Sequence, residues 1–580
     1  MSSSASSAPC RALPARRSRP GRLILNRSSG PGCGLRTRMA DNYMNTLPPD
    51  KDDNGRSLHW HLLGGNNKHR IGANSGLCVY EETDSMGDKH TKRLLFDAGV
   101  LLGDRRYPEY PELADCDSII PDYSRFLKKK GEAADPAEPL DAIFLTHNHV
   151  DHLGALPFLA LMGYELPKVY ATPYTAKRLE QEFTNAGIEP EEWPEIISIA
   201  PGTPVQEGPV KVSAFWVSHS TPQAVGFFIE TPEGNIVNPG DFKLDPTVVW
   251  GPAFNEEQYK KLAAREVDLL LLDSTGADRD IIPTTEEDVR ETLRGLMDKH
   301  PGKRFIIAVM SGFEENVASV AKVASEYDRT LWISGWSHEQ SLSALKETGM
   351  TLSDHVGKEL EVRSLGSPKS ARDLADMKPG DSVIIVTGAA GAPGSTLPRA
   401  ADGTHPALKL DKKTDIIVFC APSIPGQESS RERMLSVLRA KGFEVLTRKD
   451  AELYSQAHAR LPELIEFAKM TNPKMLMPIH GDEHLRAANA EAMDKLGIKT
   501  ISADNGDVIR ITKKGCWSVN PESKGKPKFL GFKTLQGSAW NDRNYMMIKA
   551  PQEKRADMTP EPANNNQKNK RPKIFNVNPK

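Results

Sequence analysis

A buried strand that ends in a cluster of metal-ligand residues is the feature that most constrains this sequence. The apolar run AIFL, residues 142–145, leads directly into THNHVDHL, which places His147, His149, Asp151 and His152 within six positions. A single His-x-His pair is commonly an accident of a protein surface, but four such residues directly after a strand are difficult to explain that way. Alternate residues of an extended segment project to the same side, so His147 and His149 can converge on one point, and Asp151 and His152 on another. The segment therefore predicts a metal site at the end of a strand.

The donor atoms in this segment indicate a catalytic metal site rather than a structural one. Imidazole nitrogen and carboxylate oxygen, without thiolate, suit Zn²⁺ or Mn²⁺ at a catalytic centre. The six cysteines are scattered and form no CxxC pair, which argues against a thiolate zinc site or a disulfide framework and fits a reducing compartment.

Further ligands are needed to complete two metal shells, and three residues in later segments are candidates. His219, Asp241 and His480 each follow an apolar run. Taken singly, such a residue is more often a hydrogen-bonded core or loop residue. The two oxygens of Asp241 can each bind one ion, and two ions about 3.5–4 Å apart would hold a bridging hydroxide, a nucleophile suited to a phosphate ester or an amide.

The spacing of apolar runs changes along the chain. From residue 57, short runs separated by Gly, Pro and Asp predict a sheet-rich core with interleaved helices. Near residue 275 a regular alternation begins, with a helix predicted over 284–300, capped by Thr284 or Thr285, and a strand over 304–310. Alternating helices and strands predict a parallel sheet, so the chain as a whole is expected to be a layered α/β protein.

Several segments carry a resemblance to a known family. THNHVDHLGAL, GNIVNPGDFKLD and LFDAG resemble the metallo-β-lactamase superfamily. LLLLDSTGADR, SGFEENVASV, APSIPGQE, MPIHGDEHLRAANAEA and SADNGDVIRIT are similar, in the same order, to the ribonuclease J group of its β-CASP branch. The resemblance covers roughly residues 57–513, and the combination of motifs is specific for the ribonuclease J branch.

The resemblance implies a fold and a division of the chain. The expected fold is an α/β metallo-β-lactamase αββα sandwich with an inserted β-CASP α/β domain. The expected segments are an N-terminal extension, disordered or mis-annotated, over 1–56, the first part of the metallo-β-lactamase domain over 57–274, the β-CASP insertion over 275–450, the second part of the metallo-β-lactamase domain over 451–513, and a basic, mostly disordered tail over 514–580.

The resemblance also assigns metal ligands, residue by residue. It implies that His147, His149 and His219 bind one metal ion. It implies that Asp151, His152 and His480 bind the other, with Asp241 bridging the two. Asp97 in LFDAG would orient a ligand histidine by a hydrogen bond.

Two further residues match β-CASP motifs. Asp273 in DST matches the first motif and His458 the second, while His480 matches the third and doubles as a ligand. His458 would steady the scissile phosphate or protonate the leaving oxygen. Alternatively, His458 merely caps a helix and Asp273 is a buried turn carboxylate. With Asp151, these two are the expected catalytic residues.

The segments that correspond to the substrate pocket depart from the family pattern. Residues 387–393 read TGAAGAP where the family has a TGSQGEP-like turn, and Gln-Ala stands before His458 where the family has Ser-Gly. Family members recognise a 5′-monophosphate there, and the changes put that recognition in doubt. Trp336 would stack on a base or be a packed aromatic residue. The expected pocket residues are Trp336, Ser337, Gly388, Gln456 and Ala457.

The resulting functional hypothesis is a dinuclear zinc-dependent ribonuclease, with manganese as the alternative metal. It would hydrolyse single-stranded RNA by attack of a metal-bridged hydroxide, in exo mode, endo mode or both, in RNA processing and decay. The alternatives are a hydrolase of single-stranded DNA or another phosphoester, and an RNA-binding scaffold that has lost catalysis. Suitable residues at all seven ligand positions count against the scaffold.

Charge and the N-terminal composition bear on partners and location. The net charge of -2 gives no global attraction to nucleic acid, so any such attraction must come from local patches. No apolar run reaches the roughly 18 residues that a membrane span needs. Residues 1–38 contain eight arginines but no lysine or acidic residue, which is typical of an organellar transit peptide or of an over-extended start before Met39. We expect a cytoplasmic protein, or an organellar one if this segment is a transit peptide, and a homodimer is an open expectation.

Overall fold

The computed structural model describes residues 55–102, 116, 118–357, 360–422 and 427–519, together with the backbone of two later strands. The predicted N-terminal extension, apart from its last two residues, and most of the predicted tail lie outside the described residues.

Two large sheets form the first part of the fold. The eight-stranded sheet has the order β10-β9-β7-β3-β2-β1-β23-β24. Its strands, in chain order, are β1 Ser57–Gly64, β2 Ser75–Thr83, β3 Lys89–Phe96, β7 Ala142–Phe144, β9 Val169–Ala171, β10 Ile196–Ser198, β23 Val508–Thr512 and β24 Gly515–Ser518. The six-stranded sheet has the order β11-β12-β13-β14-β15-β22. Its strands are β11 Val205–Glu207, β12 Val210–Trp216, β13 Val225–Glu230, β14 Asn235–Asn238, β15 Leu269–Asp273 and β22 Leu476–Ile479.

The two sheets pack face to face through one apolar core. Alternate residues of β1, Leu58, Trp60 and Leu62, are buried in this core with Phe96 of β3 and Phe227 of β13. The rings of Phe96 and Phe227 cross at an edge-to-face angle with their centroids 5.5 Å apart. Because successive side chains of a strand point to opposite faces, the other residues of each strand must be covered from outside.

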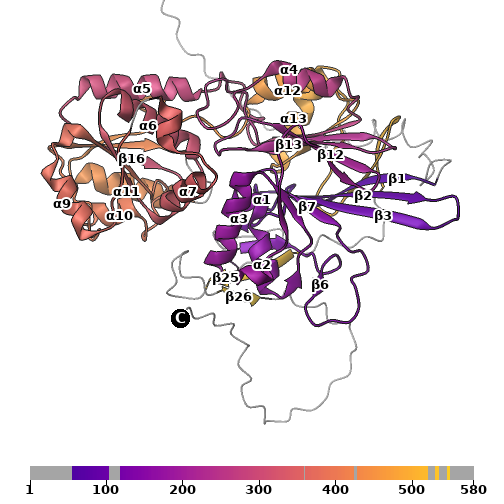
Figure 1. Ribbon diagram of the computed structural model, residues 1–580. Coiled ribbons are helices and arrows are strands. Elements are labelled where there is room, and N and C mark those ends of the chain that lie inside the picture. Colours follow the sequence, from indigo (N-terminus) through magenta and orange to yellow (C-terminus); the bar gives the residue numbers. More distant parts are fainter. Residues whose placement is uncertain are drawn as a thin grey trace, which may run out of the picture. The chain divides into compact units, whose positions relative to one another are not determined.

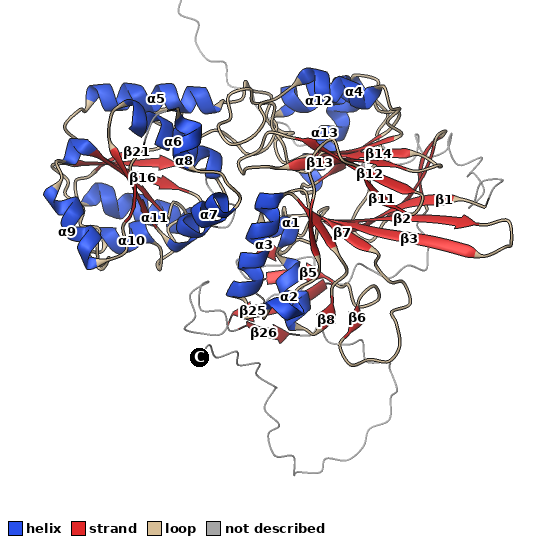
Figure 2. Cartoon of the chain, viewed as in Figure 1, coloured by secondary structure: helices blue, strands red, loops and turns tan. Residues whose placement is uncertain are grey.

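Helices supply that outer cover on both sheets (Figure 2). Leu156 and Leu179 pack on the outer face of the eight-stranded sheet. Tyr259, Leu464 and Met493 pack on the outer face of the six-stranded sheet. The helices that carry these residues and their neighbours are α1 Val150–Leu153, α2 Ala155–Leu161 and α3 Pro173–Asn185 on the first sheet, and α4 Glu256–Ala263, α12 Leu461–Thr471 and α13 Glu483–Lys495 on the second. The result is an αββα sandwich, as the sequence predicted.

An inserted domain lies in the chain between two strands that are neighbours in the six-stranded sheet. β15 and β22 pair in parallel, with Leu270 beside Leu476, although some two hundred residues separate them in the chain. The intervening segment forms a third, wholly parallel sheet of order β18-β17-β19-β16-β20-β21. Its strands are β16 Arg304–Val309, β17 Thr330–Ser334, β18 Val362–Ser364, β19 Ser382–Val386, β20 Asp415–Cys420 and β21 Glu444–Leu446.

Helices cover both faces of the third sheet (Figure 1). Phe305 and Ile307 of β16 pack into one core and Ile306 and Ala308 into the other, as the strand period requires. One face carries α5 Glu286–Lys299, α6 Glu314–Glu326, α7 Trp336–Glu347 and α8 Leu352–Val356, and the other carries α9 Pro368–Asp376, α10 Thr396–Ala401 and α11 Glu428–Ala440. Helix α5 begins after Thr285, whose hydroxyl accepts a hydrogen bond from the Asp288 amide in a capping box.

The remaining elements are short. Two small sheets have the orders β26-β25-β5-β4 and β6-β8. Their strands are β4 Leu101–Leu102, β5 Ser118–Pro121, β6 Lys128–Lys129, β8 Tyr164–Glu165, β25 Phe529–Thr534 and β26 Tyr545–Ile548. Two 3-10 helices span Pro190–Glu192 and Pro379–Asp381. Among the described helices, none combines the length and apolar composition that a membrane span requires.

Three segments of the tail that was expected to be mostly disordered form strands. β24 extends the eight-stranded sheet past residue 513 because it pairs antiparallel with β23 and buries Cys516. β25 pairs antiparallel with β5, and β26 with β25. Open strand edges offer unpaired backbone groups, and these segments satisfy them.

Candidate metal centre

The candidate site residues lie where strands end. His147 and His149 follow β7, His219 follows β12, and Asp241 follows β14. Asp273 ends β15 and His480 follows its parallel neighbour β22. Loops at strand ends are positioned by a rigid scaffold, so residues far apart in the sequence converge here. Asp241 depends on Gly240, whose backbone has a φ of 62° and whose Cα lies so close to Thr146 that a Cβ would meet its side chain at 2.9 Å.

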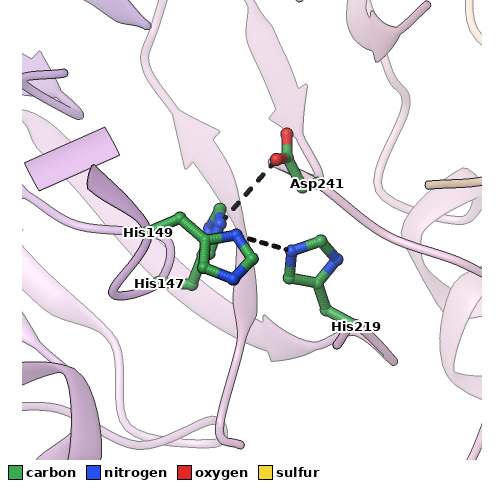
Figure 3. A group of neighbouring side chains, drawn as sticks. All are labelled: His147, His149, His219 and Asp241. Atoms are coloured by element: carbon green, nitrogen blue, oxygen red, sulfur yellow. Dashed lines mark hydrogen bonds and ion pairs between the residues drawn. The ribbon is translucent and has the colours of Figure 1, made fainter. Parts of the chain in front are cut away.

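His147, His149, His219 and Asp241 form the first ligand group (Figure 3). One donor atom from each lies within 4.8 Å of the others. His219 Nε2 is 3.2 Å from His149 Nδ1, and His147 Nε2 is 3.7 Å from Asp241 Oδ2. The three imidazole rings meet edge to face, which turns their nitrogen atoms toward a common point.

Asp151, His152, His480 and again Asp241 form the second ligand group. His152 Nε2 is 3.1 Å from Asp241 Oδ2, and His480 Nε2 is 3.3 Å from Asp151 Oδ2. The structure therefore brings together all seven residues that the sequence predicted as ligands, in two groups that share Asp241.

Asp97 fixes the orientation of His152. Its carboxylate accepts hydrogen bonds from His152 Nδ1 at 2.8 Å and from the backbone amide and hydroxyl of Thr146. These bonds leave His152 Nε2 directed at the ligand group. Asp97 has a φ of 60°, an uncommon backbone conformation for a residue other than glycine.

Asp273 holds two histidines at once. Its Oδ2 accepts a hydrogen bond from His458 Nδ1 at 2.8 Å, and its Oδ1 lies 3.2 Å from His480 Nδ1. His458 is not the cap of α12, because the residue at that position is Arg460. The side chain of His458 is 24% exposed, whereas that of Asp273 is buried. The site therefore presents His458 at its accessible side with its Nε2 uncommitted to Asp273.

Four contacts at the site were not predicted from the sequence. Asn74 Nδ2 lies 3.2 Å from Asp151 Oδ2 and 3.0 Å from His152 Nε2. His149 Nε2 donates to the carbonyl of Gly312 at 2.8 Å, and His219 Nδ1 donates to the carbonyl of Ala457, also at 2.8 Å. Asn74 lies within residues 57–513, the range that the family resemblance covers, but backbone carbonyls have no side-chain signature in a sequence.

The electrostatic surroundings of the two groups differ. Burial and the positive charges of neighbouring histidines lower the pKa of His147 and of His219. Burial also acts to lower the pKa of His480, but Asp241 and two other carboxylates outweigh it and raise that pKa to about 10. His147 and His219 are therefore held neutral, the form that binds a metal ion.

The expected pocket residues lie in less enclosed surroundings, with two exceptions. Trp336 is 37% exposed at the start of α7, and Ser337 Oγ lies 2.6 Å from Ser311 Oγ. Gly388 has a φ of 105° in the loop after β19. Gln456 and Ala457, also expected to bind substrate, are buried. Gln456 and Ala457 lie in the segment that returns from the inserted domain. The Gln456 side chain accepts a hydrogen bond from the Thr284 amide, and the Ala457 carbonyl accepts one from His219 Nδ1.

Comparisons with known proteins identify two domains in the chain. Residues 93–301 match the model of the beta-lactamase superfamily domain, and residues 302–438 match that of the ribonuclease J beta-CASP domain. Ribonuclease J of Sinorhizobium meliloti is 30% identical over 445 residues, which cover 76% of this chain and 72% of that protein. Ribonuclease J of Thermus thermophilus is 29% identical over 72% of this chain and 70% of that protein. For Corynebacterium glutamicum ribonuclease J the identity is 28%, over 80% of this chain and 59% of that protein.

A solved structure shares the fold. A protein of unknown function from Enterococcus faecalis aligns over 78% of this chain and 100% of its own length, with a TM-score of 0.53 and 16% identity. At that identity the likeness concerns the fold alone. The two matched domain models and the extent of the match to Sinorhizobium meliloti ribonuclease J settle the family: the chain belongs to the ribonuclease J family.

Proposed function

We propose that the protein is a ribonuclease that uses two divalent cations to hydrolyse phosphodiester bonds in single-stranded RNA. The observation that carries the proposal is the pair of buried ligand groups that share Asp241. Family membership favours RNA over DNA as the substrate. Residues suited to metal binding at all seven positions favour an enzyme over an RNA-binding scaffold.

The side chains present fit divalent metal ions. The carbonyls of Gly312 and Ala457 can only accept, so His149 Nε2 and His219 Nδ1 carry hydrogens. In the neutral rings that metal binding requires, the other nitrogens, His149 Nδ1 and His219 Nε2, face each other at 3.2 Å with their lone pairs. That separation is close to the edge of about 3.3 Å of a tetrahedral zinc site with bonds of about 2.0–2.1 Å. A cation between these nitrogens removes their repulsion.

Two unsatisfied atoms support the same assignment. His147 Nε2 and Asp241 Oδ1 are buried and have no hydrogen-bond partner among the described residues. A buried polar atom without a partner destabilises the fold by about 1–3 kcal/mol, and metal coordination would offset this. His147, His149, His219 and Asp241 would hold one ion, and Asp151, His152, His480 and Asp241 the other. Nitrogen and oxygen donors without sulfur suit zinc, which we propose, and also manganese.

Bound ions would polarise the phosphate and acidify water, so the protein side chains have three remaining tasks. Asp97 and Asp273 keep the histidines in the tautomer and orientation that ligation needs. His458 supplies a proton from its Nε2 to the leaving 3′ oxygen, which leaves a 5′-phosphate on the other product. The Asp273 carboxylate, 2.8 Å from His458 Nδ1, stabilises the imidazolium that makes this transfer.

The test compares the full chain with an Asp151→Ala, His152→Ala double variant. Both are incubated with one labelled oligonucleotide prepared as 5′-monophosphate RNA, as 5′-hydroxyl RNA and as DNA, with Zn²⁺ or Mn²⁺ added. We expect cleavage of RNA by the parent alone and about two bound ions per parent chain by elemental analysis. Cleavage of DNA but not RNA would contradict the substrate, and RNA binding without cleavage by a metal-loaded parent would contradict the enzyme.

A further inference from the structure

Arg460 is a buried cation that forms no ion pair with a carboxylate among the described residues. The residue is 4% exposed, caps the start of α12, and lies two positions after His458. Its Nε is buried and has no hydrogen-bond partner in the part of the chain that the structure describes. An arginine is charged at every physiological pH, and burying an unpaired charge is expensive. A structural role in the free protein does not explain this arrangement.

The nearest carboxylate is engaged elsewhere. Glu463 stands three residues after Arg460, on the first turn of α12. Its Oε1 accepts a hydrogen bond from the Leu244 amide and its Oε2 one from the backbone amide of Arg460, both at 2.8 Å. Burial also raises the pKa of Glu463, so its negative charge is not favoured there. Glu463 therefore secures backbone atoms and does not neutralise the guanidinium.

Two other arginines add to the positive charge. Arg279 lies beside the start of α12, where its carbonyl accepts a hydrogen bond from the Leu461 amide at 3.2 Å and Gly276 forms a β-bridge with Arg460. Burial, then the charges of Arg279 and Arg448, lower the pKa of Arg460 to about 10. The charges of Arg279 and of Arg448 thus each act against the charge of Arg460.

The two partner arginines are accessible. The side chain of Arg279 is 52% exposed and that of Arg448 is 29% exposed. Each has an acidic neighbour only at 3.6 Å, Asp278 for Arg279 and Glu452 for Arg448, beyond hydrogen-bond distance. Arg448 also donates to the Tyr454 hydroxyl at 3.1 Å, which fixes its direction. Hydrogen-bonding capacity toward an anion remains on both residues.

We propose that Arg279, Arg448 and Arg460, the arginine cluster, form a subsite for a phosphate group of the RNA chain beside the cleavage centre. Arg279 and Arg448, the more exposed of the three, bind the phosphate oxygens, and the buried Arg460 supplies charge that the bound anion neutralises. Guanidinium groups match phosphate geometry, and the N-terminal end of α12 adds to the favourable potential. The cluster shares a chain segment with His458, so a phosphate held here fixes the register of the strand at the scissile bond. This inference rests on the proposed ribonuclease function.

The first experiment removes the accessible charges. An Arg279→Gln, Arg448→Gln variant is compared with the parent and with Arg372→Gln, which alters an exposed arginine on α9. Binding of single-stranded RNA is measured with a chelator present, so no cleavage occurs, over a series of salt concentrations. We expect Kd to rise about tenfold. The dependence of log Kd on log salt should become shallower, because a protein that contacts fewer phosphates releases fewer counter-ions from the RNA when it binds. Arg372→Gln should match the parent.

The second experiment separates binding from structure at Arg460. In Arg460→Met the apolar side chain replaces a buried unpaired charge, so we expect an unchanged or higher Tm together with weaker RNA binding. A lower Tm with parental Kd would show that Arg460 is structural and would overturn its place in the subsite. Parental Kd and salt slope in the Arg279, Arg448 variant would overturn the subsite itself.

Comparing 5′-monophosphate RNA with 5′-hydroxyl RNA shows whether the subsite binds a terminal or an internal phosphate. RNA binding by the parent protein tests the proposed ribonuclease function separately. If the variant loses affinity for 5′-monophosphate RNA and not for 5′-hydroxyl RNA, the subsite takes a terminal phosphate. An equal loss for both assigns it to an internal phosphodiester. A parent that binds no RNA in either form contradicts the ribonuclease function, and the inference falls with it, whereas a binding parent with unaffected variants contradicts the inference alone.

Discussion

The metal centre and the loops at Trp336 and Gly388 are built in opposite ways. In the metal centre most side chains are buried, and the ligand histidines have a second nitrogen fixed, for example His152 by Asp97 and His149 by the Gly312 carbonyl. Trp336 is partly exposed, and Ala389, Ala390 and Ala392 offer no side-chain hydrogen bonds in the Gly388 loop. The difference shows that the chemistry of this protein depends on many mutually supporting contacts, while the surroundings expected to select the substrate depend on few.

The largest effect is expected at Asp241, the residue common to both ligand groups. Asp241→Asn keeps the size of the side chain but removes the charge that balances two cations. We expect metal content to fall below two ions per chain and kcat on RNA to fall at least about a thousandfold, since metal ions contribute several kcal/mol to transition-state stabilisation. Elemental analysis and single-turnover cleavage measure both. Asp402→Asn, at the exposed end of α10, is the control, and a metal-replete, active Asp241→Asn protein would refute the bridging role.

Gly312 tests whether the inserted domain supports the metal centre. Its φ is 85°, and a Cβ would lie 3.1 Å from Cδ2 and Nε2 of the His149 ring. Gly312→Ala should tilt that ring and weaken its bond to the carbonyl, and changes of this kind lower metal affinity by about 10–100-fold. Competition with a chelator measures the affinity.

A matched glycine separates backbone strain from the collision. Gly349 has a φ of 78°, but its Cβ would meet nothing within 4 Å. Gly349→Ala should therefore share the loss of Tm that comes from a positive φ and keep parental metal affinity. Equal metal affinities in the two variants would show that the ring contact with Gly312 does not matter.

A smaller and pH-dependent effect is expected at Glu315, which joins α6 to the segment after His219. Its carboxyl oxygens accept from the Val249 and Trp250 amides, and its own amide donates to the Ser220 carbonyl. Burial, then the charge of Glu286, raise its pKa from 4.5 to about 8. The folded state then binds more protons at Glu315 than the unfolded state between these values, so the contribution of Glu315 to stability is highest below pH 4.5 and falls as pH rises toward 8.

Glu315→Gln should remove that fall. The difference in unfolding free energy between parent and variant is expected to change by at most about 1.4 kcal/mol per pH unit within the window. Denaturant titrations at several pH values measure it, and Glu291→Gln, at an exposed position of α5, is the control. Parallel pH profiles for parent and Glu315→Gln would show that Glu315 is ionised in the folded protein.

The contrast between the two regions also explains what the sequence could predict. His147, His149, Asp151 and His152 were predictable because all four follow one apolar run within six positions. His219, Asp241 and His480 were only candidates from their own positions, and the family resemblance assigned them as ligands. The support at Gly312 and Ala457 comes from backbone carbonyls, which any residue provides, so only the tertiary structure reveals it.

Burial of polar residues was the second limit. Gln456 has the composition of a pocket residue, yet it is buried and accepts a hydrogen bond from the Thr284 amide. Arg460 is a charged residue at the start of a helix, a position that is usually exposed, yet it is 4% exposed. Hydrophobic periodicity predicts which apolar residues are buried. It does not predict which polar residues become buried in the segment that returns from the inserted domain.

The smallest effect is expected at Trp336, which belongs to the region with few supporting contacts. Stacking of a base on an aromatic side chain contributes about 1–3 kcal/mol, and the partly exposed Trp336 should give the lower end of that range. Trp336→Ala should therefore raise KM for RNA about fivefold and leave kcat and metal content at parental values, while Trp336→Phe should retain most of the affinity. A lower Tm with an unchanged KM would instead identify Trp336 as a packing residue, and the loop at the start of α7 would then have no part in holding the substrate.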